Sequence, residues 1–295
     1  MTHIQPAAGY AGAMFKIGAL LLGVMLCTGC SATAPPAGPA SSGTASSGTA
    51  SSGPSPSGHT SATSAPFTLV AHRGGALVYP ESSAEAFEAV GRTAFPIETD
   101  LRQLRDGTLV PLHDDAAERT MAGLSGRPGG ITLEQWTAAR IRHPQGGAEG
   151  TPTTWEAMLD SYGGRNILVP ELKDPAIDPV AFAETIVKRG IQDTVVVQTF
   201  SFPAAQALAG SGLQVLYLLR DGEEPDPESI SSSGISHVGP HKGVSAGYLN
   251  RLKDSGLTVW PYTVNDGANA ARLRAAGADG VFTDNPWELA QHLGR

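Results

Sequence analysis

The sequence predicts a (β/α)8 barrel, and three observations support this fold class. Short apolar runs alternate with helix-like segments from Phe67 to the end of the chain. The runs are almost continuously apolar, as are the strands of a parallel sheet that is covered by helices. Eight such units follow one another, which is typical of the closed barrel. A doubly wound open sheet is the alternative that the same alternation allows.

The predicted strands alternate with predicted helices along the chain. The strands are Phe67–Ala71, Phe95–Asp100, Ile167–Glu171, Val195–Gln198, Gln214–Leu219, His237–Gly239, Leu257–Tyr262 and Gly280–Thr283. The helices are Ser82–Val90, Pro179–Arg189, Pro203–Ala209, Ala246–Ser255, Ala268–Ala276 and Pro286–Leu293. Ser82, Asp266 and Asp284 are expected to cap helices, because their side chains can accept hydrogen bonds from the first free backbone N–H groups.

One further strand candidate, Leu109–His113, breaks the count of eight. A parallel crossover needs about a dozen residues or more, and Asp106-Gly107 between two strand-like flanks instead indicates a hairpin. We therefore expect the second strand to run on above the barrel, turn and return, which brings His113 close to Asp100. Residues 114–150 fit no barrel unit, and we expect them to form a small loop-rich insertion that caps the mouth of the barrel.

The 295 residues are not all expected to belong to the barrel. Residues 1–30 resemble a lipoprotein signal peptide, in which Lys16 precedes an apolar run shorter than the ~20 residues of a membrane span. The run ends at Cys30, the candidate for lipidation. Residues 31–66 are Ser, Gly, Thr, Ala and Pro, the composition of a flexible tether. We expect an exported protein, secreted or held on the outer face of the cell membrane by the lipid anchor only, with the barrel at 67–295.

Composition excludes several other classes of function. The chain has 20 Lys and Arg against 28 Asp and Glu, a formal net charge of −8, and no basic stripe that would indicate a nucleic-acid partner. Both cysteines, Cys27 and Cys30, lie in the leader, so the barrel has no disulfide and no thiol nucleophile.

Ionisable side chains gather where the first three predicted strands end. They are His72, Arg73, Glu98, Asp100, Glu171 and Lys173, with His113 returned by the hairpin. The carboxyl ends of barrel strands share one face, where active sites lie. Converging carboxylates repel one another, and a hard divalent cation, Ca²⁺ or Mg²⁺, would relieve that repulsion. The two histidines can take and give protons near neutral pH, and arginine matches the geometry of a phosphate.

An ordered set of short motifs extends this pattern over Ala71–Pro286. The motifs are His72-Arg73-Gly74, Pro80-Glu81-Ser82, Glu98-Thr99-Asp100, Asp106-Gly107, His113-Asp114, Glu171-Leu172-Lys173, Thr263-Val264-Asn265 and Gly280-Val281-Phe282-Thr283-Asp284. In this order they resemble the glycerophosphodiester phosphodiesterase family, which belongs to the phosphatidylinositol-specific phospholipase C-like phosphodiesterase barrels. The resemblance covers nearly all of the predicted barrel and implies the same (β/α)8 fold.

The resemblance also implies a reaction, the metal-dependent hydrolysis of a glycerophosphodiester to glycerol 3-phosphate and an alcohol. It implies His72 and His113 as the acid–base pair, with water or the glycerol 2-hydroxyl as the attacking group. It further implies that Glu98, Asp100 and Glu171 hold the metal, that Arg73 and Lys173 bind the phosphate, and that Glu81, Tyr262 and Trp260 are candidates for the substrate side.

Two other functions stay open on the sequence. A tether to the membrane is compatible with a phospholipase D-like or C-like activity on lysolipids or phospholipids. From a different class, the chain could be a non-catalytic surface lipoprotein that binds a ligand on a degenerate barrel, because fold alone does not determine function.

Overall fold

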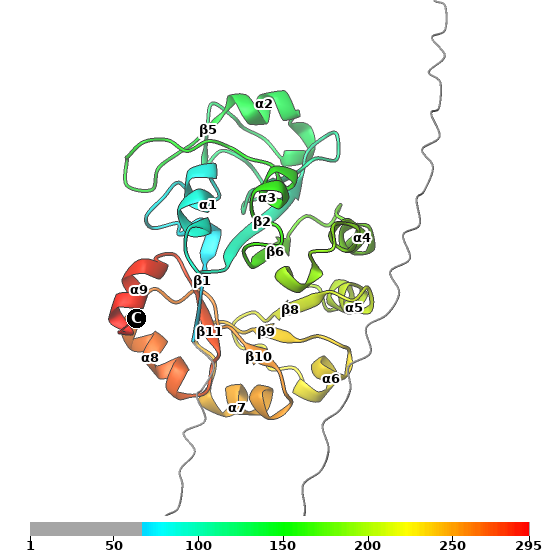
Figure 1. Ribbon diagram of the computed structural model, residues 1–295, viewed down its shortest axis with the longest axis vertical. Helices are drawn as coiled ribbons and strands as arrows, with labels where there is room; N and C mark the ends of the chain where they lie inside the picture. The colour runs from blue at the N-terminus through cyan, green and yellow to red at the C-terminus, as the bar shows by residue number, and fades with distance from the viewer. Residues whose placement is uncertain (1–66, 295) are drawn as a thin grey trace, which may run out of the picture. The chain divides into compact units, whose positions relative to one another are not determined.

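The computed structural model describes residues 67–294, which form the predicted (β/α)8 barrel (Figure 1). Parallel strands pair in the order β10-β9-β8-β7-β6-β2-β1-β11. Two backbone hydrogen bonds, from Asp279 N to Val259 O and from Phe282 N to Pro261 O, join the end strands of this order and close the ring. The predicted signal peptide at 1–30, with Cys30, and the predicted tether at 31–66 lie outside the described residues.

The strands agree with the sequence-based assignment to within a few residues at each end. They are β1 Thr68–Ala71, β2 Ile97–Gln103, β6 Leu168–Leu172, β7 Val196–Thr199, β8 Gln214–Leu218, β9 His237–Gly239, β10 Thr258–Val259 and β11 Gly280–Thr283. β10 is much shorter than the predicted Leu257–Tyr262, since Pro261 has no backbone N–H to donate.

Helices cover the outside of the strands, and Figure 1 shows α4 to α9 following one another around the ring. The helices of the barrel are α1 Ala84–Gly91, α3 Trp155–Tyr162, α4 Pro179–Arg189, α5 Phe202–Gly210, α6 Pro227–Ser232, α7 Ala246–Asp254, α8 Gly267–Ala275 and α9 Pro286–His292. Single turns of 3-10 helix are η1 His72–Gly74, η2 Pro128–Gly130 and η3 Gln192–Thr194. α3 and α6 are not among the helices predicted from the sequence; both are short and begin at the polar caps Thr154 and Asp226.

Two predicted helix caps are wrong by one residue. Ser83, not Ser82, accepts the cap hydrogen bond of α1, from Ala86 N at 3.1 Å. Asn285, not Asp284, caps α9, so the carboxylate of Asp284 is available for another contact. The third prediction is confirmed, because Asp266 caps α8.

Side chains of the strands alternate between the barrel interior and the helices, as the period of two requires. Val70 packs in the interior with Phe282, whereas its neighbours Leu69 and Ala71 pack among the helices. In β2, Ile97 and Leu101 join the helix-facing core. By the same alternation, Glu98 and Asp100 lie on the interior side of the strand, above the apolar side chains that fill the barrel.

The predicted hairpin is present. β3, Leu109–Pro111, pairs antiparallel with the far end of β2, with Leu101 opposite Pro111. The turn passes through Gly107, whose φ of 91° is in the left-handed region that favours glycine. The returning segment reaches Asp100, whose carbonyl accepts a hydrogen bond from Leu112 N at 2.9 Å. His113 is the next residue, so the hairpin carries it to the carboxylates of β2.

The insertion after β3 is more ordered than the loop-rich cap that the sequence predicts. It contains α2 Leu133–Ala138 and a small antiparallel sheet of β4 Met121–Ala122 and β5 Arg140–Ile141. It also has a hydrophobic core, separate from that of the barrel, made of Leu104, Val110, Leu112, Ala117, Met121, Ile131, Trp136, Ala139 and Ile141. The hairpin contributes to this core, so the insertion and the hairpin pack as one unit, which we call the insertion unit.

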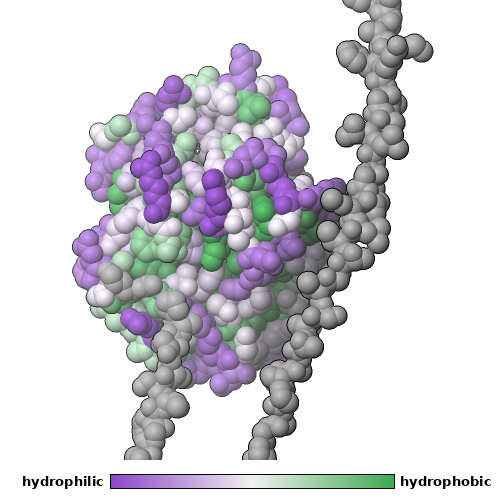
Figure 2. All heavy atoms as spheres, viewed as in Figure 1, coloured by the Kyte–Doolittle hydropathy of each residue, from purple (hydrophilic) through white to green (hydrophobic). Residues whose placement is uncertain are grey.

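Among residues 67–294, few large apolar side chains are exposed, namely Leu77, Leu133, Ile167, Val180 and Val187. On the face shown in Figure 2, hydrophobic residues form small separate patches among hydrophilic ones. Scattered apolar residues of this kind are normal for a protein surface. None of the helices in 67–294 combines the length and apolar composition of a membrane span.

We expect Trp136→Ala to destabilise the insertion unit. The side chain is fully buried and its Nε1 donates to Thr153 O at 2.9 Å, so its loss should cost ~3–5 kcal/mol by cavity formation. Leu133→Ala, in the same helix but 37% exposed, is the control and should cost less than ~1 kcal/mol. Chemical denaturation measures both free energies of unfolding; equal values would contradict a packed core in the insertion.

Candidate active site

A cavity of about 170 Å³ opens at the carboxyl ends of the strands. It is lined by His72, Arg73, Glu98, Asp100, His113, Glu171, Lys173, Gln198, Phe200, Leu218, Tyr262, Thr263 and Phe282. The seven ionisable residues predicted from the strand ends and the hairpin thus lie together. The apolar residues form the floor, where Phe282 and Leu218 belong to the barrel interior.

His72 follows the last residue of β1, and its ring is held by Asp284, a residue near the C-terminal end of the described chain. Its Nδ1 lies 2.6 Å from Asp284 Oδ1. Because an ionised carboxylate only accepts hydrogen bonds, Nδ1 carries the proton and Nε2 is left for the cavity. Asn265 holds Asp284 in turn, donating from Nδ2 to Asp284 Oδ2 at 2.7 Å and accepting from Asp284 N at 2.8 Å.

Arg73 has a left-handed backbone conformation, with φ 52° and ψ 33°. This is uncommon for a residue with a side chain and is often found at functional sites. The turn directs its backbone N–H to Glu98 Oε2, at 2.6 Å. Its guanidinium donates from Nη1 to Glu81 Oε1 at 3.3 Å, and its Nε lies 3.3 Å from Asp100 Oδ2. Arg73 therefore links the first strand end to the carboxylates of the second.

The three predicted metal ligands, Glu98, Asp100 and Glu171, are almost completely buried. Gln198 Nε2 donates to Glu98 Oε1 at 2.8 Å. Lys173 Nζ donates to Glu171 Oε1 and Oε2 at 3.2 and 3.1 Å, and it lies 3.3 Å from Asp100 Oδ1. Arg73 and Lys173 thus compensate part of the negative charge of the three buried carboxylates.

The carboxylates do not share this compensation equally. Burial raises the pKa of Glu98, and the negative charge of Asp100 raises it further. Burial and Asp100 likewise raise the pKa of Glu171. Burial would also raise the pKa of Asp100, but the nearby Lys173 and Arg73 hold it well below its usual range. Glu98 and Glu171 therefore hold a negative charge less readily than Asp100, and additional positive charge nearby would favour their ionised forms.

The chemistry of these donors fits a hard divalent cation. In the part of the chain that the structure describes, no three His, Cys, Asp or Glu side chains already stand in a metal-binding arrangement. The donors are nevertheless all oxygens, as Ca²⁺ and Mg²⁺ prefer. Asp100 Oδ2 is buried and accepts no hydrogen bond, and the raised pKa values of Glu98 and Glu171 reflect a deficit of positive charge. The site residues thus suit the cation that the sequence implies.

His113 lines the same cavity as His72 and is more exposed, 33% against 16% of the side chain. Its Nδ1 lies 2.8 Å from Asp114 Oδ1. The backbone is held as well, because Arg102 Nη2 donates to His113 O at 2.8 Å. The adjacent Asp114 thus orients one histidine as the distant Asp284 orients the other.

The two histidines have opposite pKa shifts. Burial lowers the pKa of His72, but the negative charges of Glu98 and Asp284 outweigh it and raise the pKa above 6.5. Burial also lowers the pKa of His113, and the positive charges of Arg73 and Lys173 add to this effect. Asp100 and Asp114 oppose it only in part, so the pKa of His113 falls below 6.5. His72 therefore keeps a proton more readily than His113.

The predicted substrate-side residues divide into three groups. Tyr262 lines the cavity, but its hydroxyl donates to Leu219 O at 2.8 Å and so faces backbone. Glu81 does not line the cavity and contacts Arg73 from behind. Trp260 is buried in the barrel interior against Phe282 and does not reach the cavity, because it lies one layer deeper than Tyr262 along the same chain segment.

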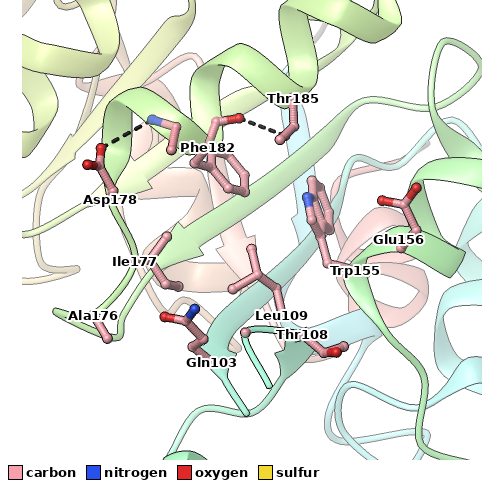
Figure 3. A pocket seen from close by; sticks show the side chains of 12 residues that line it. Gln103, Thr108, Leu109, Trp155, Glu156, Ala176, Ile177, Asp178, Phe182 and Thr185 are labelled. Atoms are coloured by element: carbon pink, nitrogen blue, oxygen red, sulfur yellow. Dashed lines mark hydrogen bonds between the residues drawn. The ribbon is translucent and has the colours of Figure 1, made fainter. Parts of the chain in front are cut away.

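A second hollow lies outside the barrel, between α3, α4 and the β2–β3 hairpin (Figure 3). Its walls include Leu109 and the stacked rings of Trp155 and Phe182, whose centroids are 5.9 Å apart. It has no histidine, and one of its two carboxylates, Asp178, caps α4. The hollow therefore lacks the cluster of titratable groups that distinguishes the cavity at the strand ends.

Known proteins share both the sequence pattern and the fold. The sequence model of the glycerophosphoryl diester phosphodiesterase family matches residues 72–179 and 178–288. The Bacillus subtilis protein YhdW is 30% identical over 236 residues, covering 74% of this chain and 94% of YhdW. A glycerophosphodiester phosphodiesterase of Caldanaerobacter subterraneus is 27% identical over 233 residues, covering 75% of this chain and 95% of that protein.

A solved structure adds support for the fold. An Oleispira antarctica phosphodiesterase, in complex with the product sn-glycerol-3-phosphate, superposes with a TM-score of 0.66 at 21% identity. The superposition covers 77% of this chain and 97% of the other. The family match spans the strand ends from His72 onward and continues beyond Asp284. The chain therefore belongs to the glycerophosphoryl diester phosphodiesterase family, whose members are phosphoric diester hydrolases.

Proposed function

We propose that this protein hydrolyses glycerophosphodiesters to glycerol 3-phosphate and an alcohol, using a divalent cation and two histidines. One observation carries the proposal: two histidines with opposite pKa shifts line the same small cavity as three buried carboxylates, an arginine and a lysine. The cavity of about 170 Å³ suits a compact glycerophosphoryl group better than a diacylated lipid. Glycerol 3-phosphate as the product bound by the Oleispira antarctica relative supports the same reaction.

In this mechanism His113 is the base and His72 the acid. Neutral His113 removes the proton from the attacking oxygen, either water or the glycerol 2-hydroxyl, as that oxygen bonds to phosphorus. Protonated His72, held by Asp284, gives its proton to the departing alkoxide as the ester P–O bond breaks. If the 2-hydroxyl attacks, the cyclic phosphodiester that forms is opened by water in a second step with the two roles reversed.

Positive charge in the cavity opposes the charge that develops on the phosphoryl oxygens. Arg73 is placed to bind these oxygens in the fork geometry that suits phosphate, with Lys173 as a second cation. Glu98, Asp100 and Glu171 would hold Ca²⁺ or Mg²⁺. When bound, the cation polarises the phosphoryl group and the glycerol hydroxyls.

The location of the protein is a further proposal, and it rests on the sequence of residues 1–30. We propose that the chain is exported and attached through Cys30 to the outer face of the membrane. The substrates would then be diesters outside the cell.

We expect His72→Ala and His113→Ala each to lower kcat by ~10²–10⁴-fold, the usual contribution of a general acid or base. His292→Ala, at the exposed end of α9, is the control and should retain full activity. The measurement is the release of glycerol 3-phosphate from glycerophosphocholine and glycerophosphoethanolamine. Full activity in both cavity variants would disprove the acid–base assignment, and turnover of a lysophospholipid alone would indicate a lipase.

Removal of divalent cations should abolish this release, and Ca²⁺ or Mg²⁺ should restore it. Binding to the folded state should also raise the melting temperature. In Glu98→Gln the rise should be much smaller, because one carboxylate ligand is lost. Glu184→Gln, on the exposed surface of α4, should behave like the wild type. A chelator-resistant enzyme, or an unchanged thermal response in Glu98→Gln, would argue against the cation site.

The pH profile of kcat/KM should be bell-shaped. Activity rises as His113 loses its proton, below pH 6.5 because its pKa is lowered, and falls as His72 loses its proton, above pH 6.5 because its pKa is raised. Asp284→Asn removes a negative charge that favours protonated His72 and should move the alkaline limb to lower pH. Asp254→Asn, exposed on α7, should leave the profile unchanged. An alkaline limb unaffected by Asp284→Asn would exclude His72 as the acid.

A further inference from the structure

Arg119 lies in the turn before β4 and extends from the insertion unit toward the rim of the cavity. Its Nη1 and Nη2 donate to Glu81 Oε2 and Oε1, both at 2.8 Å. Its Nε donates to Asp114 Oδ2, and its Nη2 to Asp114 Oδ1 at 3.1 Å. One guanidinium therefore holds two carboxylates that belong to different segments, the loop between β1 and α1 and the chain that follows β3.

Each of these carboxylates has a second partner that lines the cavity. Asp114 Oδ1 lies 2.8 Å from His113 Nδ1, and Glu81 Oε1 accepts from Arg73 Nη1 at 3.3 Å. Arg119 itself does not line the cavity. It stands directly behind both the proposed base and the proposed phosphate ligand, one carboxylate away from each.

The position of Arg119 is set by the insertion unit. Arg142 Nη1 donates to Glu118 O at 2.6 Å and to Arg119 O at 3.3 Å, and Arg142 N donates to Thr120 O at 2.7 Å. Met121, two residues after Arg119, is buried in the core of the unit. The packing of the insertion is therefore transmitted to the guanidinium through a short, hydrogen-bonded stretch of backbone.

An ordinary surface ion pair would have no such consequence, because exposed pairs are weak and loosely held. Arg119 is 50% exposed, but its partners Glu81 and Asp114 are only 16% and 28% exposed. Both are contacted in the planar, multidentate way that arginine allows and that the single ammonium group of lysine cannot reproduce. The contacts of Arg119 therefore fix orientation.

We propose that Arg119 is a positioning residue, which acts through Asp114 on His113 and through Glu81 on Arg73. The insertion unit then contributes to the active site, since it supplies Arg119, which fixes the orientation of the base His113 and of the phosphate ligand Arg73. This inference rests on the proposed function, in which His113 and Arg73 act on the substrate.

The test compares Arg119→Gln, Arg119→Lys and the control Arg127→Gln in the full chain with its divalent cation. Arg127 is exposed in the same insertion, and within the described residues its side chain makes no hydrogen bond or ion pair; only its carbonyl oxygen accepts a hydrogen bond, from Gly130 N at 2.9 Å. Steady-state release of glycerol 3-phosphate from glycerophosphocholine gives kcat and KM. Arg119→Gln should lower kcat by ~10–100-fold, the usual effect of removing a group that orients an active-site residue, with a smaller change in KM. Arg119→Lys should restore only part of kcat, and Arg127→Gln should match the wild type.

A double-mutant cycle tests the route of the effect. If Arg119 acts through Asp114, adding Arg119→Gln to Asp114→Asn should lower kcat much less than it does in the wild type. Multiplicative losses in the two variants would overturn this route. Circular dichroism and the melting temperature establish whether the variants are folded. If Arg119→Gln does not fold, Arg119→Lys, which keeps the charge, is used in its place.

Two outcomes separate this inference from the proposed function. A wild-type chain that releases no glycerol 3-phosphate from any diester overturns both. An active wild type with an unchanged kcat in Arg119→Gln overturns the positioning role alone.

Discussion

The site depends on one electrostatic constraint, the burial of three carboxylates where three strands of one barrel end. Such burial is unfavourable unless each charge is paired or hydrogen-bonded. Glu98 accepts hydrogen bonds from the backbone of Arg73 and the amide of Gln198, while Asp100 and Glu171 share Lys173. The left-handed turn at Arg73 belongs to the same arrangement, because it directs the N–H to Glu98 and the guanidinium toward Asp100. The residual repulsion makes the cavity attractive to a cation.

The fold meets this constraint with simple geometry. Alternation along β2 places Glu98 and Asp100 on the interior side, and the parallel register sets Asp100 opposite Glu171 of β6. The extension of β2 into a hairpin then returns the chain to Asp100. Asp100 and Glu171, about seventy residues apart in the sequence, thus meet at one height in the barrel.

What could be predicted from the sequence follows from periodicity and local turn chemistry. The two-residue period of a strand predicts that Glu98 and Asp100 share one face. The Asp106-Gly107 turn predicts that the chain returns and brings His113 close to Asp100. Contacts that depend on closure of the ring were not accessible: Asp284 was expected to cap a helix, yet it meets His72 across the first and last strands. Trp260 was expected near the substrate, but the height of a residue in the barrel cannot be read from alternation alone. The role of Arg119 was missed because it depends on how the insertion packs.

The two histidines follow residues that pack in different hydrophobic cores. His72 follows Ala71, which packs in the barrel, whereas His113 follows Leu112, which packs in the insertion unit. The distance between their rings therefore depends on how the insertion unit packs against the barrel. A loosening of the insertion unit would separate the pair while the barrel stayed folded, so loss of activity on heating can precede loss of the barrel. In the same way, substitutions in the core of the insertion unit around Trp136, far from the cavity, can lower activity by displacing His113.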